Sequence, residues 1–229
     1  MTITVPNLRD VGGLRALDGN VVAPGRLLRS ALPFHDDVAP EGITWPPSLV
    51  IDLRSPMEHG QEHPLTPLGP RLVNLPLLHS LRPGWMQGAS LVDLYALVLD
   101  DSAHLLVQLV REVAAAQGPT LVHCAAGKDR TGISVALVLS LLGVQVSDIE
   151  ADYLRTRESL QAIDARLRRD EAAYPVNPVF HAVAADALQL VLDRWHSHPG
   201  GAVGWYESAG GTAGDVQRLR ESMLGGSLS

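Results

Sequence analysis

The chain of 229 residues contains one cysteine, Cys124, and this scarcity sets the first limits on its function. A single thiol excludes an internal disulfide framework and a metal site built from several cysteines. Long hydrophobic runs are also missing, since the longest uncharged apolar stretch, residues 131–147, is shorter than a membrane span and contains Gly143 and Gln145. Residues 1–10 have no basic region followed by an apolar core. The sequence therefore predicts no signal peptide and no integral membrane association, and we expect a cytoplasmic protein.

Basic residues are outnumbered as well. Eighteen Lys and Arg face 25 Asp and Glu, giving a net charge of −7 with no block of like charge, so nucleic-acid binding is not expected. Among the lysines and arginines only Lys128 is a lysine, and it follows Cys124 by four residues. A hydrophobic content of 46% is enough to bury the core of one domain. We predict a single domain over residues 1–229, with residues 84–101 as a candidate helical lid.

The hydrophobic pattern predicts strands that alternate with helices. Short apolar runs within residues 21–30, 48–53, 71–78 and 120–123 are typical of buried strands. Apolar residues at helical spacing predict helices over residues 84–101, 102–117, 131–142, 149–173, 182–195 and 215–224. Residues 198–201 are expected to form a turn. This order predicts the α/β class, with a mainly parallel central sheet flanked by helices.

The informative segment is residues 121–132, LVHCAAGKDRTG, in which a predicted strand runs into a loop and then into a predicted helix. A loop that closes on a helix N-terminus points backbone N–H groups inward and forms a nest for an anion. Gly127 permits the turn of the backbone, and Arg130 offers a planar fork for two phosphate oxygens. The same positive field stabilises a thiolate on Cys124, which becomes a nucleophile beneath a bound phosphate.

The spacing Cys-x5-Arg alone is not specific, and a buried structural cysteine beside a helix cap is the plain alternative. His123 before the loop, Gly127 within it, Thr131 after it and the strand-loop-helix context favour the chemical interpretation. Two further functions stay open at this point. A non-catalytic phosphate-binding module would use the same nest, and a sulfurtransferase would use a cysteine loop without needing Arg130.

The stretch HCAAGKDRTG, residues 123–132, resembles the signature loop of cysteine-dependent protein tyrosine and dual-specificity phosphatases, and more narrowly that of atypical bacterial tyrosine phosphatases. Residues 7–13 (NLRDVGG), 25–30 (GRLLRS) and 51–55 (IDLRS) resemble N-terminal signatures of the same subfamily. The resemblance spans nearly the whole chain. It implies a cysteine-phosphatase fold and hydrolysis of a phosphomonoester through a cysteinyl-phosphate intermediate, with no metal and no cofactor.

The resemblance also implies roles for individual residues. Cys124 would be the nucleophile, Arg130 the phosphate clamp, and His123 would orient the loop through its ring. The hydroxyl of Thr131 would help the thiolate to leave in the hydrolytic step. Arg54 would contact phosphate, and Asp52 would lie at the same entrance to the phosphate site. Backbone donors to the phosphate would come from Ala125, Ala126, Gly127, Lys128 and Asp129.

The general acid is open among three carboxylates. Many relatives carry it in a Trp-Pro-Asp pattern, but Trp45-Pro46-Pro47 lacks the Asp. Asp129 within the loop is the first candidate, Asp52 at a strand end the second, and Asp93 in the candidate lid the third. For each of them, an ordinary structural carboxylate is the alternative.

Two further signals bear on partners. His59 and His63 match the H-x-x-E-H pattern of zinc proteases, but Pro56, Gly60 and Pro64 oppose the helix that such a site needs, so no metal site is predicted. Lys128 either reaches a second phosphate of a phosphoinositide or points to solvent. The substrate is therefore expected to be a phosphorylated protein, on tyrosine or on serine and threonine, or a phosphoinositide, and the oligomeric state stays open.

Overall fold

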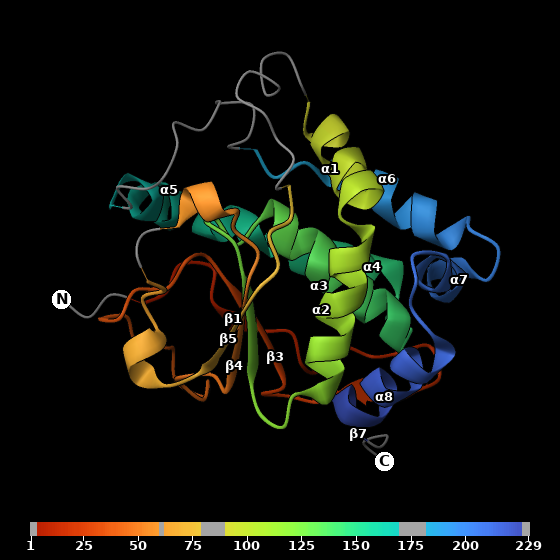
Figure 1. The fold of residues 1–229 in the computed structure, drawn as a ribbon, viewed down its shortest axis with the longest axis horizontal. Coiled ribbons are helices and arrows are strands. Elements are labelled where there is room, and N and C mark those ends of the chain that lie inside the picture. The colour runs from red at the N-terminus through yellow and green to blue at the C-terminus, as the bar shows by residue number, and fades with distance from the viewer. Residues whose placement is uncertain (1–3, 60–61, 79–89, 170–181, 226–229) are drawn as a thin grey trace.

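The computed structural model describes residues 4–59, 62–78, 90–169 and 182–225, and its centre is a five-stranded sheet (Figure 1). In spatial order the strands are β1 (Arg9–Asp10), β3 (Leu27–Ser30), β6 (Thr120–His123), β4 (Leu49–Asp52) and β5 (Arg71–Asn74). Only β1 pairs antiparallel, with β3, and the remaining pairs are parallel. The predicted α/β class with a mainly parallel sheet is confirmed.

The three central strands are buried on both faces, as their runs of Leu, Val and Ile predict for a parallel sheet. Their parallel register pairs His123 at the end of β6 with Ser30 at the end of β3 and with Asp52 at the end of β4. The three loops that follow these strands therefore leave the sheet at one edge. The carboxyl edge of a parallel sheet is where such folds place their ligand sites.

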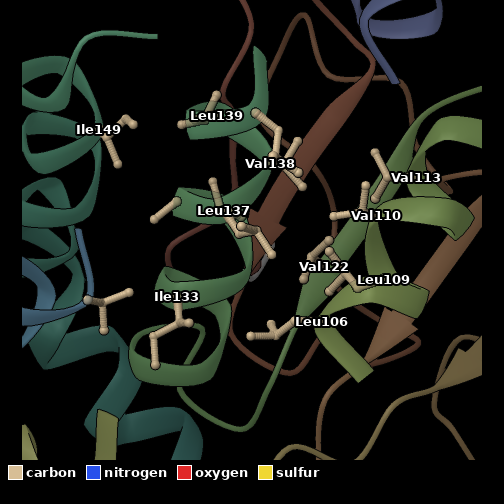
Figure 2. Packing of buried hydrophobic residues seen from close by; sticks show 14 of the residues in the cluster. Leu106, Leu109, Val110, Val113, Val122, Ile133, Leu137, Val138, Leu139 and Ile149 are labelled. Atoms are coloured by element: carbon tan, nitrogen blue, oxygen red, sulfur yellow. The ribbon is translucent and has the colours of Figure 1, made fainter. Parts of the chain in front are cut away.

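One face of the sheet carries most of the helices (Figure 1). Val122 of β6 packs there between Leu106 and Leu109 of one helix and Ile133 and Leu137 of the next (Figure 2). The helices of the described residues are α1 (Leu91–Asp101), α2 (Ala103–Ala115), α3 (Asp129–Leu142), α4 (Val146–Leu154), α5 (Leu160–Arg169), α6 (Ala185–His196), α7 (Gly201–Ser208) and α8 (Ala213–Met223).

The other face of the sheet is covered by loops. Leu28, Val50 and Leu121 form a small second cluster there with Leu65, which precedes the 3-10 helix η2 (Thr66–Leu68). A second 3-10 helix, η1 (Pro56–Glu58), follows β4. A separate two-stranded antiparallel sheet joins β2 (Val21–Val22) to β7 (Leu224–Gly225). Among the helices in the described part of the chain, none has the length and apolar character that a membrane span requires.

Two helix predictions differ from the structure, because one predicted helix is divided and one helix was not predicted. The helix expected over 149–173 is divided into α4, a 3-10 turn η3 (Arg155–Ser159) and α5, and residues 170–173 lie outside the described residues. The 3-10 turn buries Thr156, whose hydroxyl accepts hydrogen bonds from Asn7 and Arg9, so a tertiary contact overrides the helical period. No helix was predicted over α7, which begins at Gly201, the last residue of the expected turn 198–201. Gly204 is required there, since a Cβ would stand 1.9 Å from the carbonyl oxygen of Pro199.

The candidate lid falls partly on α1. Ser90 and Asp93 cap this helix, and its apolar side, which includes Tyr95, is buried against the core. Residues 84–89 of the candidate lid lie outside the described residues. A lid movement of this segment therefore stays a prediction.

Candidate active site

Cys124 directly follows β6 and is 2% exposed, and residues 124–128 connect it to α3. Gly127 turns this loop with a φ of +63°, and a Cβ on it would stand 2.1 Å from the carbonyl oxygen of Ser30. The loop therefore needs glycine for its backbone conformation and for its close approach to β3. Strand, loop and helix follow one another as the sequence predicts.

Two residues of the N-terminal signatures hold the loop. Asn7 Nδ2 and Arg29 Nη2 donate to the carbonyl oxygen of Gly127 at 2.8 and 3.1 Å. Arg29 is fixed in turn by Asp152, which also pairs with Arg9. Sequence reasoning identified these signatures only as a resemblance and missed their role, which is to brace the loop from β3 and from the segment before β1.

The anion nest has open donors. Among the residues that the structure describes, the backbone N–H groups of Ala125, Ala126 and Gly127 have no acceptor. The hydroxyl of Thr131 is buried and likewise has no hydrogen-bond partner there, Cys124 included. A buried donor costs free energy when it is left unsatisfied, and Gly127 and Thr131 are buried, whereas Ala125 and Ala126 are half-buried. A bound oxyanion would satisfy them.

Arg130, the expected phosphate clamp, is held by a residue that the sequence analysis missed. Its Nη1 and Nη2 donate to the two carboxylate oxygens of Glu58, each at 2.6 Å. Ser55 donates to Glu58 through its backbone N–H and its hydroxyl, both at 2.9 Å. Burial raises the pKa of Glu58, but the charge and hydrogen bonds of Arg130 reverse this and lower the pKa to about 2.

This ion pair leaves one edge of the guanidinium open. Nη1 also donates to the carbonyl oxygen of Leu53, so the Nη1 group is fully used. Within the described ranges, the Nε–H of Arg130 and the second N–H of Nη2 have no acceptor. These two donors lie parallel on the side of the guanidinium plane and match two oxygens of one phosphate. Glu58 therefore fixes the plane of the fork without occupying that edge.

Asp52 and Arg54 form a buried pair beneath Glu58. Arg54 donates to the Asp52 carboxylate from Nε and Nη2 at 2.8–3.1 Å, and its Nη1 donates to the Glu58 carbonyl oxygen at 3.2 Å. Burial raises the pKa of Asp52, but the neighbouring His123 and Arg54 hold it well below its usual range. Arg54 supports the Glu58 segment in this arrangement, and a direct contact of Arg54 with phosphate stays a prediction.

His123 is fully buried and forms part of a hydrogen-bonded chain. Its Nδ1 lies 3.1 Å from the Cys124 carbonyl oxygen, and its Nε2 lies 2.9 Å from Nε2 of His63. His63 Nδ1 accepts the backbone N–H of Leu65. These contacts assign the protons, because His63 Nε2 must donate to His123 Nε2 and His123 Nδ1 must donate to the carbonyl. Burial lowers the pKa of both rings, that of His63 to about 3, so both are neutral at neutral pH.

Donor atoms of Asp52, His63 and His123 lie within 4.8 Å of one another, a spacing that a metal ion could bridge. The proton assignment opposes this use. His63 accepts at Nδ1 and carries its proton on Nε2, so it has no lone pair to offer, and both Asp52 oxygens accept from Arg54. These residues fit a neutral hydrogen-bond chain better than a metal site.

The three candidate acids lie in different surroundings. Asp129 accepts a hydrogen bond from the hydroxyl of Tyr95 at 2.9 Å, and burial raises its pKa. Asp93 accepts hydrogen bonds from the backbone N–H and the hydroxyl of Ser90, the N-cap of α1, and these bonds lower its pKa. Asp52 is ionised in its pair with Arg54. Among the three, Asp129 is the carboxyl whose pKa is raised.

Lys128 does not point to solvent, and that alternative is wrong. Its side chain is 3% exposed, and Nζ donates to the carbonyl oxygen of Ala182 at 2.7 Å. Nζ also lies 3.5 Å from a carboxylate oxygen of Asp129. The ammonium therefore ties the loop to the segment before α6, a contact that no pattern in the sequence indicates.

The sequence of this chain is similar to those of known proteins. Residues 2–225 match the model of the tyrosine phosphatase family. The chain is 33% identical over 174 residues to a protein of Cupriavidus necator named for the tyrosine-protein phosphatases, covering 68% of this chain and 62% of the relative. It is 33% identical over 140 residues to the triple specificity protein phosphatase PtpB of Mycobacterium tuberculosis, covering 55% and 51%.

A tyrosine-protein phosphatase of Nostoc commune is 34% identical over 141 residues, covering 57% of this chain and 48% of the relative. The chain thus spans between 48% and 62% of the length of the curated relatives that it matches. The family match, by contrast, runs from residue 2 to residue 225 and includes the cysteine loop, the bracing residues and Glu58. The chain belongs to the tyrosine phosphatase family.

Proposed function

We propose that the protein is a cysteine-dependent phosphatase that hydrolyses phosphomonoesters through a cysteinyl-phosphate intermediate. The observation that carries the proposal is the nest above Cys124, in which the N–H groups of residues 125–127 and one edge of Arg130 have no acceptor in the described structure. These donors match the equatorial oxygens of the phosphoryl group in the transition state of its transfer. The thiol lies at the base of the same nest, where it can attack phosphorus in line.

The reaction has two steps in this proposal. The thiolate of Cys124 attacks phosphorus and forms an S–P bond, while the P–O bond to the leaving group breaks and Asp129 gives its proton to the leaving oxygen. Water then attacks the phosphocysteine, Asp129 takes a proton from it, and the S–P bond breaks to release inorganic phosphate and the thiolate. The hydroxyl of Thr131, which has no other partner in the described structure, is available to the thiolate as it leaves.

Asp129 is proposed as the acid because it is the candidate whose pKa is raised. Burial raises its pKa, whereas the pKa of Asp52 is held low by its neighbours and that of Asp93 is lowered by its capping bonds. A general acid works best when its pKa lies near the working pH. Asp52 would also have to break its hydrogen bonds with Arg54 before it could donate.

The proposed substrates are phosphorylated protein side chains, phosphotyrosine first. The relative from Mycobacterium tuberculosis carries triple specificity in its name, which supports testing phosphoserine, phosphothreonine and phosphoinositides beside phosphotyrosine. Lys128 gives little support to a phosphoinositide, because its ammonium is already bound by Ala182 and Asp129.

A direct test is to trap the intermediate. The protein is mixed with an aryl phosphate, quenched in acid within milliseconds and digested, and phosphate on the Cys124 peptide is sought by mass spectrometry. A phosphocysteine together with a stoichiometric burst of phenol supports the proposal. Phosphate binding without a burst would identify a non-catalytic binding module instead. A persulfide on Cys124 formed from a thiosulfate donor would favour a sulfurtransferase.

A further inference from the structure

The proposed acid is held by a buried pair of tyrosines from two other helices. The hydroxyl of Tyr95 in α1 donates to Oδ1 of Asp129 at 2.9 Å. The same hydroxyl lies 2.7 Å from the hydroxyl of Tyr153 in α4. Tyr95 is 0% exposed and Tyr153 is 1% exposed, so water does not compete for these bonds.

With Asp129 Oδ1 as an acceptor, the hydrogen bonds of the two tyrosines take one direction. A phenol has one proton to donate, and Tyr95 gives its proton to Asp129. The bond between the two tyrosines must therefore run from Tyr153 to Tyr95. Tyr153 therefore donates to the Tyr95 hydroxyl, which in turn donates to Asp129. In such a series of hydrogen bonds each bond polarises and strengthens the next.

The helix that carries Asp129 is shaped to admit Tyr153. A Cβ on Gly132 would stand 2.8 Å from the Tyr153 ring, so only glycine at this position lets the ring pack against the first turn of α3. Gly132, the last residue of the HCAAGKDRTG stretch, therefore packs together with the two tyrosines. This packing joins α1, α4 and the N-terminus of α3 around the Asp129 carboxyl.

We propose that Tyr95 is a positioning residue for the phosphatase reaction: its hydroxyl, oriented by Tyr153, fixes the rotation of the Asp129 carboxyl, so that Oδ2 carries the proton given to the leaving oxygen. The inference rests on the proposed function, since it assumes that Asp129 is the acid. A carboxyl whose Oδ1 accepts a hydrogen bond from a phenol carries its proton on the other oxygen. Fixing that oxygen removes a rotation that would otherwise compete with proton transfer.

The charged and titratable groups around Asp129 are few. Lys128 faces Oδ2 at 3.5 Å from the loop, Arg130 follows on α3, and Tyr95 and Tyr153 face it from α1 and α4. The Tyr95 bond stabilises the ionised carboxylate, as do the two cations. Removing the Tyr95 hydroxyl is therefore expected to move the basic limb of the kcat/KM profile to higher pH.

The test compares Tyr95→Phe with the unaltered chain on a series of aryl phosphates whose phenols differ in acidity. A good leaving group departs without a proton, whereas a poor one needs the acid. We expect kcat/KM for phenyl phosphate to fall about tenfold or more, while that for 2,4-dinitrophenyl phosphate changes less than about twofold. A merely structural role would lower both values equally and leave the pH limb in place, and that result would overturn the inference.

Tyr206→Phe is the matched control. Tyr206 is also fully buried, and its hydroxyl also donates to an aspartate, Asp215, at 3.3 Å, but Tyr206 belongs to α7 and Asp215 to α8. Its loss is expected to leave the dependence on the leaving group unchanged. Tyr153→Phe is expected to reproduce part of the Tyr95→Phe effect, because the hydrogen bond that orients Tyr95 is lost.

Asp129→Asn separates this inference from the function on which it rests. If Asp129→Asn loses activity selectively on phenyl phosphate while Tyr95→Phe does not, Asp129 is the acid and the positioning role of Tyr95 is wrong. If Asp129→Asn keeps full activity on phenyl phosphate, the assignment of the acid is wrong, and the inference falls with it. The phosphocysteine of Cys124 remains a separate measurement in both cases.

Discussion

Glu58 holds Arg130 by two parallel hydrogen bonds of 2.6 Å, from the far end of the guanidinium to both carboxylate oxygens. The two residues come from the 3-10 helix after β4 and from the first turn of α3, so the pair joins the two loops that leave neighbouring strands. It leaves the Nε side of Arg130 open, which is the side that a phosphate can use. The pair therefore sets the direction in which the clamp points.

Glu58→Gln is expected to lower kcat/KM by about 10- to 100-fold, an effect on the order of 1.4–2.7 kcal/mol. The amide has one acceptor oxygen, so it can hold only one of the two Arg130 nitrogens and the fork can rotate. Kinetics on an aryl phosphate measure the loss. Glu62→Gln, at a carboxylate for which the structure gives no pairing with Arg130, is the control and is expected to keep full activity. Equal rates for Glu58→Gln and the unaltered chain would contradict the orienting role.

The same pair predicts a loss of stability in acid. The pKa of Glu58 is lowered in the folded protein from 4.5 to about 2. The stabilisation from the ionised carboxylate is therefore complete above about pH 4.5 and disappears as the pH falls toward 2. Chemical denaturation at a series of pH values measures it. Glu58→Gln is expected to flatten this part of the curve, and an unchanged slope would show that the pair does not contribute.

Gly127→Ala is expected to destabilise the protein by more than about 2 kcal/mol and to abolish activity. The new methyl group would meet the backbone oxygen of Ser30 at 2.1 Å, and the backbone of a central strand cannot move aside. Gly201→Ala is the matched control, because Gly201 has nearly the same φ, +64°, with nothing within 4 Å. Thermal unfolding measures both. Similar losses for the two variants would mean that φ alone matters and that the contact with Ser30 does not.

Cys124→Ser is expected to abolish turnover while keeping the affinity for vanadate within about threefold, because the nest consists of backbone donors and Arg130. Turnover of an aryl phosphate and calorimetric titration with vanadate measure the two quantities separately. Arg130→Lys provides the comparison, since an ammonium cannot make two parallel bonds and should weaken vanadate binding. A residual rate above about a tenth of that of the unaltered chain would contradict the role of the thiolate as nucleophile.

The sequence predicted the local features of the site well. Cys124, Gly127, Arg130 and Asp129 stand within one short stretch, and the chemistry of a loop between a strand and a helix follows from their order. The β6 boundaries, Thr120–His123, were predicted to the residue because a short apolar run is bounded by Pro119 and by the loop. The class of the fold followed from the alternation of strands and helices.

The long-range contacts could not be predicted in this way. Glu58 lies 72 positions from Arg130, and Tyr95 lies 34 positions from Asp129, so no spacing rule connects them. Asn7 is 120 positions from Gly127, and its side chain reaches the loop only because β1 and β3 pair beside β6. The contacts of Glu58 and Asn7 depend on strand order and that of Tyr95 on the packing of α1 against α3, and one sequence carries no signal for either.

His63 shows the same limit, since its match with His59 to the H-x-x-E-H pattern predicted no metal site and gave no role for the ring, which the structure uses as the hydrogen-bond donor to His123. His63→Leu is expected to leave the fully buried Nε2 of His123 without a donor, at a cost of about 1–3 kcal/mol, and to lower kcat/KM because His123 holds the Cys124 carbonyl. His63→Gln keeps an N–H donor and is expected to recover most of the loss. Both are measured by chemical denaturation and by turnover.

The pH dependence of protein stability gives a second test of the hydrogen-bonded histidine pair. The pKa of His63 falls from 6.5 to about 3 on folding, because burial disfavours the charged ring. The unfolded chain then binds the extra proton between these values, so stability is expected to decline as the pH falls below about 6.5. His63→Gln cannot take up that proton and is expected to reduce this decline. An equal decline in His63→Gln and the unaltered chain would show that the neutral histidine pair is not its source. If EDTA abolished the activity and zinc restored it, the interpretation of His63 and His123 as a neutral hydrogen-bonded pair would be wrong, and a metal site would take its place.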